Sequence, residues 1–596
     1  MPFEDSRRLT GSNLFFAGPG AVLELAGMAR DPALFDDWRA RVARGRARLG
    51  WSLDAACVVR RHARGASLAI AAPFDQLFTA TELNEWALCS ALHALDPQHW
   101  SGLRDALRAA ALEAGPSAAS ELPAEIGEPA AMLRLEQLAA GEARPDLRAL
   151  LQTAAAHSVP WLIDDDILSL GDGVAGSDFP LAALPQAGDV AWRELRAVPT
   201  ALVTGSNGKT TTVRLIAACV RAHGWHTGYS CTDGVFADGE ELATGDYSGP
   251  AGARRVLRDR RVEAAVLETA RGGILRRGLA VMRTDVAVVT NVSADHFGEY
   301  GIHDLDALAD VKLTVGAAIV PGGWLVLNAS DPLLRSKVAG LQQRFGRCPQ
   351  IAWFTIDGAE SVVSAHVAAG GAACSLRDGR LLLWRAGVEH DLGSTQDMPL
   401  TAGGRARYNI ANLAAAALAA VGLGIEPATV AAVFARFGAQ VADNPGRLMR
   451  FEHRGVHVLV DYAHNPEGLR GLLQIADGLR SAGGRLGLVL GHAGNREDRD
   501  IERLAATAAA FCPSLVVLKE LEGFRRGREP GEVPRILRTA LLHAGMTDAA
   551  LPQRATELEA VETALDWAGP GDVVVLPVHG LAARAAVVEL LQRGHR

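Results

Sequence analysis

Short apolar runs alternate with helical patterns along the chain from Thr200 onward. The runs are four to seven residues long, and apolar residues recur at helical spacing between them. Strands that are buried on both faces of a parallel sheet give continuous apolar runs of this kind. The pattern therefore predicts an α/β fold with helix-covered parallel sheets, whose strands lie in residues 201–204, 264–268, 285–291, 456–462, 485–490, 515–518 and 572–577.

The chain before Thr200 has a different pattern. Residues Ala80–Leu92 have helical spacing and Leu103–Ala114 are rich in Ala and Leu, so helices are expected in both stretches. We expect an N-terminal α+β domain over residues 1–165. Residues 166–199 contain several Gly, Pro and Asp residues and are expected to form a linker.

The remaining chain divides near Gln440–Pro445, where polar residues and a proline interrupt the pattern. We therefore expect a central domain over residues 200–442 and a C-terminal α/β domain over residues 443–596. Residues 358–400 are richer in Gly and in short alternating stretches, which indicates a small antiparallel insert.

Composition narrows the class of protein. The 596 residues are 49% hydrophobic and 21% charged, which favours a folded, multi-domain chain. A net charge of −8 argues against nucleic acid as a partner, because proteins that bind it usually present a basic face. We find no apolar run of about 20 residues, as a membrane span requires, and no apolar stretch of a secretory signal at the N-terminus. The seven cysteines are scattered without a C-x-x-C pair, so a reduced, cytoplasmic protein is expected.

A glycine-rich loop follows the first strand of the central domain. Residues Thr204–Thr211 read TGSNGKTT, and a helical pattern over Thr211–Ala222 comes directly after them. Backbone N–H groups of such a loop cradle phosphates, the lysine reaches the terminal phosphates and the threonine hydroxyl binds Mg²⁺. A glycine turn that merely caps the helix is the alternative. The expected nucleotide-binding residues are Gly205, Ser206, Asn207, Gly208, Lys209, Thr210 and Thr211.

Three further residues are candidates for metal and phosphoryl chemistry. Glu268 ends a predicted strand, where open α/β sheets place their ligands, and a carboxylate suits Mg²⁺. His296 follows the next strand, although a lone histidine is as often structural. Lys312 lies in a predicted helix over Leu305–Ala318, where an ordinary surface lysine is the simpler interpretation.

These motifs together resemble the Mur ligase superfamily, which includes the peptidoglycan ligases and folylpolyglutamate synthase. The resemblance covers about residues 200–596 and includes the phosphate loop, Glu268, and the spacing from His296 to Lys312. It also includes the motifs YNIAN (408–412), GR (446–447) and DYAHNP (461–466). The resemblance implies a Mur-ligase-type P-loop central domain with a parallel sheet and a Rossmann-like C-terminal domain.

A narrower resemblance is to the cyanophycin synthetase family. The segments CTDGVFADGEELATGDYSGPAGARRVL (231–257), LETARGGILRRGL (267–279) and KELEGFRRGREPGE (519–532) are similar to the C-terminal half of those enzymes. RRLTGSNLFF (7–16) and FTATELNEWA (78–87) resemble their leading domain, and residues 158–173 resemble the opening of their ATP-grasp domain. Only about 30 residues then precede the phosphate loop, far too few for a grasp domain. This departure argues against polymer backbone extension.

The resemblance implies ATP and Mg²⁺ as cofactors and assigns roles to matching positions. Lys209 and Thr210 would contact the phosphates and the metal ion, and Glu268 and His296 would help to place it. Lys312 matches a lysine that is carbamylated in many Mur ligases. Asn409 and Asn412 match positions near the adenine. The C-terminal-domain residues that would complete the nucleotide site or lie beside the substrate are Arg447, Asp461, His464 and Asn465, for which structural capping of a turn is the alternative.

The same resemblance implies substrates. In cyanophycin synthetase this half of the chain attaches arginine through its α-amino group to an aspartate β-carboxylate. Small-molecule acid and amino-acid substrates are therefore expected, with a cyanophycin-like peptide as a further possibility, and the family suggests a homo-oligomer. Candidate substrate residues are Thr232, Asp233, Asp246, Ser248 and Arg271. His579 follows the last strand, where an amino substrate would sit, although a structural role is the simpler interpretation.

The leading hypothesis is an ATP-dependent, ADP-forming ligase that joins a carboxylate to an amine through an acyl phosphate. Its catalytic residues would be Lys209, Glu268, His296 and Lys312. The first alternative is a nucleotide-binding accessory subunit of a full-length synthetase, motivated by the missing grasp domain. The second is a cell-wall precursor ligase.

Overall fold

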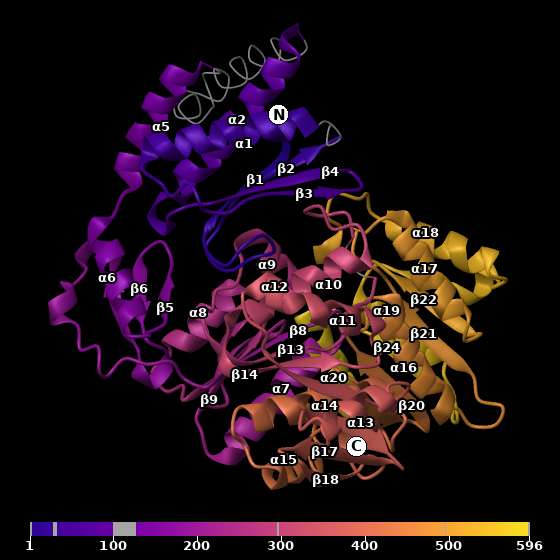
Figure 1. Ribbon diagram of the computed structural model, residues 1–596. Coiled ribbons are helices and arrows are strands. Elements are labelled where there is room, and N and C mark those ends of the chain that lie inside the picture. The colour runs from indigo at the N-terminus through magenta and orange to yellow at the C-terminus, as the bar shows by residue number, and fades with distance from the viewer. Residues whose placement is uncertain (1–2, 28–31, 99–126, 295–296, 495, 594–596) are drawn as a thin grey trace. The chain divides into compact units, whose positions relative to one another are not determined.

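The computed structural model describes residues 3–27, 32–98, 127–294, 297–494 and 496–593 (Figure 1). The chain forms two compact units that exchange segments. The first contains residues 1–205, 225–325 and 333–350, and the second contains residues 206–224, 326–332 and 351–596. The boundary falls inside the glycine-rich loop, so the helix that follows the loop belongs to the second unit together with the C-terminal part of the chain.

The N-terminal part of the first unit is an antiparallel sheet with helices on one face (Figure 1). The strand order is β1-β2-β4-β3, formed by Phe3–Leu9, Gly20–Ala26, Gly65–Ala71 and Cys57–His62. Helices α1 (Pro32–Leu49) and α2 (Leu77–Leu95) share a core with it that includes Trp38, Leu68 and Leu83. Helix α2 contains the predicted helix Ala80–Leu92, whereas Leu103–Ala114 lies outside the described residues.

The predicted linker contains folded structure. Strands β5 (Trp161–Ile163), β6 (Ile167–Leu170) and β7 (Ser177–Pro180) form an antiparallel sheet of three strands. Its apolar residues share a core with α6 (Pro145–Ala156), which follows α5 (Glu128–Glu142). Residues 166–199 are therefore more than a simple connector, because Leu168 and Leu170 pack in a hydrophobic core with residues of α6.

The rest of the first unit is built on a mainly parallel sheet of order β11-β10-β9-β12-β8-β13. Strands β8 (Thr200–Thr204), β12 (Ala264–Glu268) and β13 (Thr284–Val289) are the predicted apolar runs. They are parallel, so their carboxyl ends lie at one edge. The other elements are β9 (Thr227–Cys231), β10 (Gly234–Ala237), β11 (Glu240–Thr244), α8 (Pro250–Arg258), α9 (Arg271–Arg277), α10 (Leu305–Leu313), α11 (Pro332–Lys337) and α12 (Leu341–Phe345).

The second unit begins with α7 (Lys209–His223), and β14 (Ile319–Asn328) contributes residues to both units. Strand β15 (Gln350–Thr355) is parallel to β16 (Ala372–Arg377), and β17 (Arg380–Arg385) and β18 (Val388–Ser394) continue antiparallel. The antiparallel strands fall within residues 358–400 as predicted, but this segment also contains a helix and its first strand is parallel to β15, so it is not a separate antiparallel insert. Helices α13 (Glu360–Ala368), α14 (Arg407–Gly422) and α15 (Pro427–Phe434) belong to this part.

The C-terminal part of the second unit is a sheet of order β19-β20-β24-β21-β22-β23. Its four central strands, β20 (Val456–Asp461), β21 (Leu486–Leu490), β22 (Leu515–Lys519) and β24 (Val573–Pro577), are the predicted apolar runs. Separate hydrophobic clusters cover its two faces, as the continuous runs predicted. The remaining elements are β19 (Met449–His453), β23 (Gln553–Arg554), α16 (Pro466–Leu479), α17 (Asp498–Ala509), α18 (Glu532–His543), α19 (Glu557–Trp567) and α20 (Leu581–Arg593).

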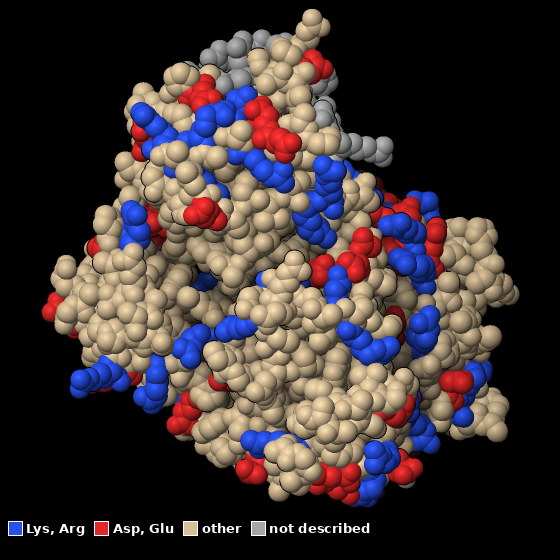
Figure 2. Space-filling model, in the orientation of Figure 1, with Lys and Arg blue, Asp and Glu red and all other residues tan. Residues whose placement is uncertain are grey.

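Charged side chains of both signs are interspersed on the face of the molecule that Figure 2 shows. Among the described helices, none has the length and hydropathy that crossing a lipid bilayer requires. The described residues also contain no group of three or more His, Cys, Asp or Glu side chains arranged to hold a metal ion.

Candidate active site

The glycine-rich loop joins β8 to α7 as predicted, and two of its glycines have little space around them. Thr290 directly follows the neighbouring strand β13. A Cβ atom on Gly205 would lie 1.8 Å from the hydroxyl oxygen of Thr290. Gly208 has φ +84°, and a Cβ atom there would lie 2.2 Å from Oδ1 of Asn412. Any larger residue would displace the loop, so the glycines set its path.

Lys209 and Thr210 begin helix α7, where the backbone N–H groups of the first turn have no partner within the helix. The Lys209 ammonium donates to the Ser206 carbonyl oxygen at 3.2 Å, so the side chain folds back over the loop. Thr210 is 4% exposed. This arrangement gives the loop a lysine and a hydroxyl beside a helix N-terminus, which is the chemistry that binds polyphosphate.

Asn412 and Asn409 lie one turn apart on α14 and are both buried. Asn412 donates to Oδ1 of Asn409 at 3.2 Å, and Asn409 donates to the Leu400 carbonyl oxygen at 3.0 Å. The structure therefore brings Asn412 to the glycine-rich loop and places Asn409 behind it. Their assignment to the adenine stays a prediction.

Residues of the C-terminal part meet the same loop within the second unit. Arg447 donates to the Thr210 hydroxyl at 3.4 Å, and Asn465 donates to Oδ1 of Asn207 at 2.8 Å. Asn465 also accepts from the Gly468 backbone N–H at 2.9 Å and so caps helix α16. Two predicted residues from distant motifs thus contact the phosphate loop, and for Asn465 the capping alternative holds as well.

Asp461 and His464 lie beside these contacts. Burial raises the pKa of the Asp461 carboxyl, while the Arg447 guanidinium and the backbone N–H of Leu448 oppose that rise. Leu448 N–H donates to Asp461 at 2.6 Å, which fixes the turn that carries Arg447. His464 contacts the ring of Tyr462 edge-on, with 5.4 Å between centroids.

Sequence reasoning missed Asn444, Arg214 and Tyr462. Asn444 donates to the Thr211 hydroxyl at 3.3 Å and accepts from Arg214, a residue of α7, at 3.2 Å. Arg214 also donates to the Pro445 carbonyl oxygen at 2.8 Å. The Arg447 guanidinium stacks on the Tyr462 ring at 4.4 Å. Asn444 immediately precedes the Pro-Gly-Arg turn, and an Asn-Pro pair at a domain break is the signal that could have identified it.

Glu268 occupies the end of β12 in the first unit and is 1% exposed. Its carboxylate accepts from the Thr232 hydroxyl at 3.0 Å and from the Thr232 backbone N–H at 3.3 Å. The carboxylate therefore does not face solvent, although it ends a strand at the edge of the sheet. A buried carboxylate held by two hydrogen bonds is the kind of oxygen ligand that a hard divalent cation requires.

The other predicted substrate residues gather near this strand end. Asp246 accepts from the Ser248 backbone N–H at 3.0 Å and from its hydroxyl at 2.6 Å. The Ser248 carbonyl oxygen accepts from the backbone N–H of Ala270, just beyond Glu268, at 2.7 Å. Asp233 is buried, and its carbonyl oxygen accepts from the Gly245 N–H at 3.1 Å. The hairpin β10–β11 and the turn after it are thereby attached to the Glu268 strand.

Arg271 and Lys312 are both buried. Arg271 pairs with Glu299 at 2.5 Å, and Glu299 is a residue that sequence reasoning missed. Lys312 is 3% exposed on α10, so the interpretation as a surface lysine is wrong; its carbamylation stays a prediction. His296 lies outside the described residues. Helix α10 ends at Leu313 and continues as a 3₁₀ turn to Ala318, close to the predicted helix.

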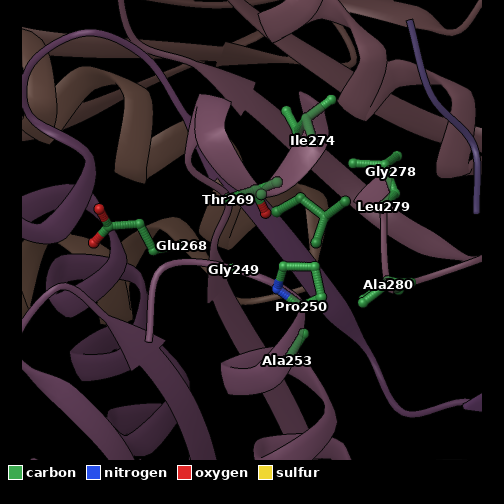
Figure 3. Close-up of a pocket in the computed structure, with 12 residues that line it drawn as sticks. Gly249, Pro250, Ala253, Glu268, Thr269, Ile274, Gly278, Leu279 and Ala280 are labelled. Carbon is green, nitrogen blue, oxygen red and sulfur yellow. The ribbon is translucent and has the colours of Figure 1, made fainter. Parts of the chain in front are cut away.

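A small apolar pocket lies behind the Glu268 strand end. It is partly open to solvent and is lined mainly by aliphatic and glycine residues of α8, α9 and the following segment. Figure 3 shows the Glu268 carboxylate directed away from Pro250, Ile274 and Leu279. A ligand in this pocket would therefore not face the Glu268 carboxylate.

Models of two known domain families match the chain from residue 203 onward. The model of the Mur ligase middle domain matches residues 203–420, and that of the Mur ligase glutamate ligase domain matches residues 446–577. A UDP-N-acetylmuramoyl-L-alanyl-D-glutamate–2,6-diaminopimelate ligase of Xanthomonas campestris is 30% identical over 388 residues, which is 63% of this chain and 71% of that protein. The chain belongs to the Mur ligase family.

Among curated relatives, cyanophycin synthetases match this Mur ligase family chain at higher identity. The protein of Trichormus variabilis is 38% identical over 385 residues, and that of Nostoc is 37% identical over 381 residues. Each match covers 64% of this chain but only 41% of the relative. The chain thus matches about two fifths of the length of these relatives, over its Mur-like part. The predicted family and fold class are confirmed.

The C-terminal sheet of the Mur ligase fold carries a buried charged cluster at its strand ends, formed by Lys519, Glu557 and His579. Lys519 is fully buried and its ammonium donates to Glu557, to the Pro577 carbonyl oxygen and, at 3.2 Å, to Nδ1 of His579. Glu557 also accepts from the backbone N–H groups of His579 at 2.9 Å and Gly580 at 2.7 Å.

The cluster fixes the protonation of His579. Burial lowers the pKa of the His579 imidazole to about 4, so the ring is neutral near pH 7. Nδ1 of His579 lies 3.2 Å from the Lys519 ammonium nitrogen and 3.6 Å from a Glu557 carboxylate oxygen, so it faces both members of the ion pair. Nε2 is buried and has no hydrogen-bond partner within the described residues. The cluster therefore holds a neutral, buried imidazole next to a buried ion pair.

Proposed function

We propose that the chain is an ATP-dependent, ADP-forming ligase that joins a carboxylate to an amine through an acyl phosphate. The observation that carries this proposal is the loop Gly205–Lys209, which is shaped by Thr290 and Asn412 and hydrogen-bonded to Asn465. Helix α7 after it is tied to Arg447 and Asn444. A loop that only capped a helix would have no need for these partners.

The chemistry follows from the side chains. A carboxylate is a poor electrophile, and its phosphorylation turns one oxygen into a leaving group. The ammonium of Lys209 offsets the charge that develops on the transferring phosphoryl group, and Mg²⁺, when bound, does the same. The amine then attacks the acyl carbon, and collapse of the tetrahedral adduct releases phosphate.

Thr210, Glu268 and His296 are the proposed ligands of Mg²⁺. Glu268 fits this role because it is a buried carboxylate at the end of β12, held in place by hydrogen bonds from Thr232. Lys312, whose side chain is buried on α10, is proposed to serve as a carbamate.

For the substrates, we propose an aspartyl-type carboxylate and an amino acid such as arginine, in cyanophycin-related metabolism. The support is the identity of 38% to a cyanophycin synthetase, against 30% to the peptidoglycan ligase of Xanthomonas. The segment that carries Glu268 and Arg271 also resembles the cyanophycin enzymes. ATP, the acid and the amine are the proposed small-molecule partners.

The test is ADP release coupled to mass detection of the ligated product, with acids and amines screened in pairs. We expect release that requires both substrates and falls about 100-fold or more in a Lys209→Met variant. Lys337→Met is the matched control, because Lys337 pairs with Asp306 and Asp310 on the surface of α10. Undiminished turnover by Lys209→Met would contradict the proposal. Turnover only after addition of a full-length synthetase would favour the accessory subunit.

A further inference from the structure

The N-terminal sheet contacts the segment that carries Arg271, although more than 250 residues separate them in the sequence. Arg7 on β1 donates from Nε to the Leu275 carbonyl oxygen of α9 at 2.8 Å. Its guanidinium also lies 4.4 Å from the ring centroid of Tyr300, next to Glu299. One buried side chain thus touches both the helix that begins at Arg271 and the turn that bears the partner of Arg271.

Arg7 is itself held in a fixed orientation. It is 8% exposed, pairs with Glu24 at 2.8 Å and donates to Asp5 at 2.5 Å. Glu24 is buried on the adjacent strand β2 and accepts in addition from the Ser67 hydroxyl on β4 at 2.6 Å. Three strands of the N-terminal sheet therefore orient the guanidinium, and the planar group is aimed at α9 with little freedom.

The loop after β1 adds backbone contacts at the end of α9. Thr10 donates from its backbone N–H to the Arg277 carbonyl oxygen at 2.8 Å, and the Leu279 N–H donates to the Ser12 carbonyl oxygen at 2.8 Å. The two chains approach so closely that a Cβ atom on Gly11 would lie 2.0 Å from the Leu279 carbonyl oxygen. The fit of this loop to the segment after α9 is specific.

A second strand holds the turn. Arg60 on β3 donates to the Gly301 carbonyl oxygen at 3.0 Å, and the rings of His62 and His303 lie 5.2 Å apart. A Cβ atom on Gly301 would lie 2.7 Å from the His62 ring. Residues 299–303 are therefore fixed from the N-terminal sheet by contacts independent of Arg7.

We propose that the N-terminal sheet is a positioning element of the acid-substrate site, which holds α9 and residues 299–303 so that Arg271 stays oriented. Arg7 and Arg60 are the positioning residues. This inference rests on the proposed function, because the assignment of Arg271 to an acid-substrate site depends on the chain being a carboxylate–amine ligase. At its other end α9 is joined to the predicted substrate residues through the hydrogen bond from Ala270 to Ser248, so the N-terminal contacts and the substrate residues brace the same short helix.

The experiment compares Arg7→Met, Arg60→Met and the control Arg8→Met by hydrogen–deuterium exchange. Arg8 lies on the same strand but is exposed. We expect amides of residues 271–279 to exchange about tenfold faster or more in Arg7→Met, because a charged hydrogen bond to a buried carbonyl is lost. Residues 299–303 should exchange faster in Arg60→Met. All amides of Arg8→Met should match the parent, and exchange in helix α2 reports how far the loss of the partner of Glu24 loosens the N-terminal sheet itself.

A kinetic measurement separates positioning from mere packing. In Arg7→Met we expect the KM for the acid to rise about tenfold or more, while the KM for ATP stays within about twofold. Equal exchange at residues 271–279 and 299–303 in the parent, Arg7→Met and Arg60→Met would overturn the proposal. So would an unchanged KM for the acid. A parent protein without ligase activity would contradict the proposed function. Hydrogen–deuterium exchange requires no substrate, so it would still test whether Arg7 and Arg60 hold α9 and residues 299–303.

Discussion

At the scale of residues, the buried charges of the C-terminal sheet depend on each other. The Glu557 carboxyl is partly buried, which opposes ionisation, but hydrogen bonding to His579 and the charge of Lys519 hold its pKa well below its usual range. Burial lowers the pKa of the Lys519 ammonium, and Glu557 opposes that change. Removing either partner would leave the other buried without compensation.

We therefore predict that Lys519→Met destabilises the protein by about 3–5 kcal/mol in urea unfolding, the cost of an unpaired buried charge. Lys337→Met is the comparison, because Lys337 is 20% exposed and its ion pairs should contribute about 1 kcal/mol or less. The double variant Lys519→Met/Glu557→Gln should regain part of the loss. If Lys519→Met and Lys337→Met have equal free energies of unfolding, the buried pair of Lys519 and Glu557 does not contribute more to stability than a surface ion pair.

Individual candidate site residues could be predicted where they belong to a short local sequence motif. Lys209, Thr210 and Glu268 follow from the loop and from the end of a strand, because those positions face ligands in any open α/β sheet. Glu299, Asn444 and Glu557 could not be found in this way. Their partners Arg271, Thr211 and Lys519 lie 28, 233 and 38 residues away, and nothing local marks the pairs.

At the scale of elements, the apolar runs predicted the strands closely because both faces of each sheet are covered. Strand β12 coincides with the predicted run 264–268, and β20, β21, β22 and β24 differ from theirs by one residue or less at each end. The small sheet β5–β7 was missed because its strands have only three or four residues and are separated by Asp-rich and Gly-rich segments, which are typical of loops.

Helix α7 provides the element-scale prediction, because it has a left-handed glycine at each end. Gly208→Ala should reduce nucleotide affinity and turnover on the order of 100-fold, since the new Cβ atom would collide with Asn412 and displace the loop by about 1 Å or more. Gly224→Ala is the matched control. Gly224 has φ +105° with nothing within 4 Å of a Cβ atom, so strain is added without a collision.

Nucleotide titration calorimetry and the coupled ADP assay measure the effect of both α7 variants. The Gly224→Ala variant should lose about 1 kcal/mol of stability and keep its affinity. If Gly208→Ala binds nucleotide as the parent does, the close contact with Asn412 does not shape the binding site.

At the scale of the whole molecule, the two compact units differ from the domains that the sequence suggested. The predicted boundary near residue 442 follows the break in the hydrophobic pattern, whereas the units divide inside the phosphate loop and group α7 with residues 351–596. Sequence patterns report neighbours along the chain. The grouping arises from long-range contacts, such as Arg214 with Pro445 and Asn465 with Asn207, which the pattern does not encode.

Because α7 and the C-terminal part belong to one compact unit, we predict that nucleotide binding slows amide exchange in the C-terminal part as well. A non-hydrolysable ATP analogue should slow amide exchange in residues 205–212 and also in residues 461–468, because Asn465 donates to Asn207 in the loop at 2.8 Å. Ligand binding protects segments that order together with the site. Strands β16–β18 provide an internal reference, because they do not contribute to the loop contacts described here.

The variant Asn465→Ser separates this coupling from direct binding. A serine hydroxyl still caps α16 through the Gly468 N–H but is too short to reach Asn207, so the fold should be kept while the link to the loop is lost. We expect the analogue to protect residues 205–212 in this variant as in the parent, and residues 461–468 at least about threefold less. Undiminished protection of residues 461–468 would mean that the nucleotide itself, or another contact such as Arg447 with Thr210, couples the C-terminal part to the loop.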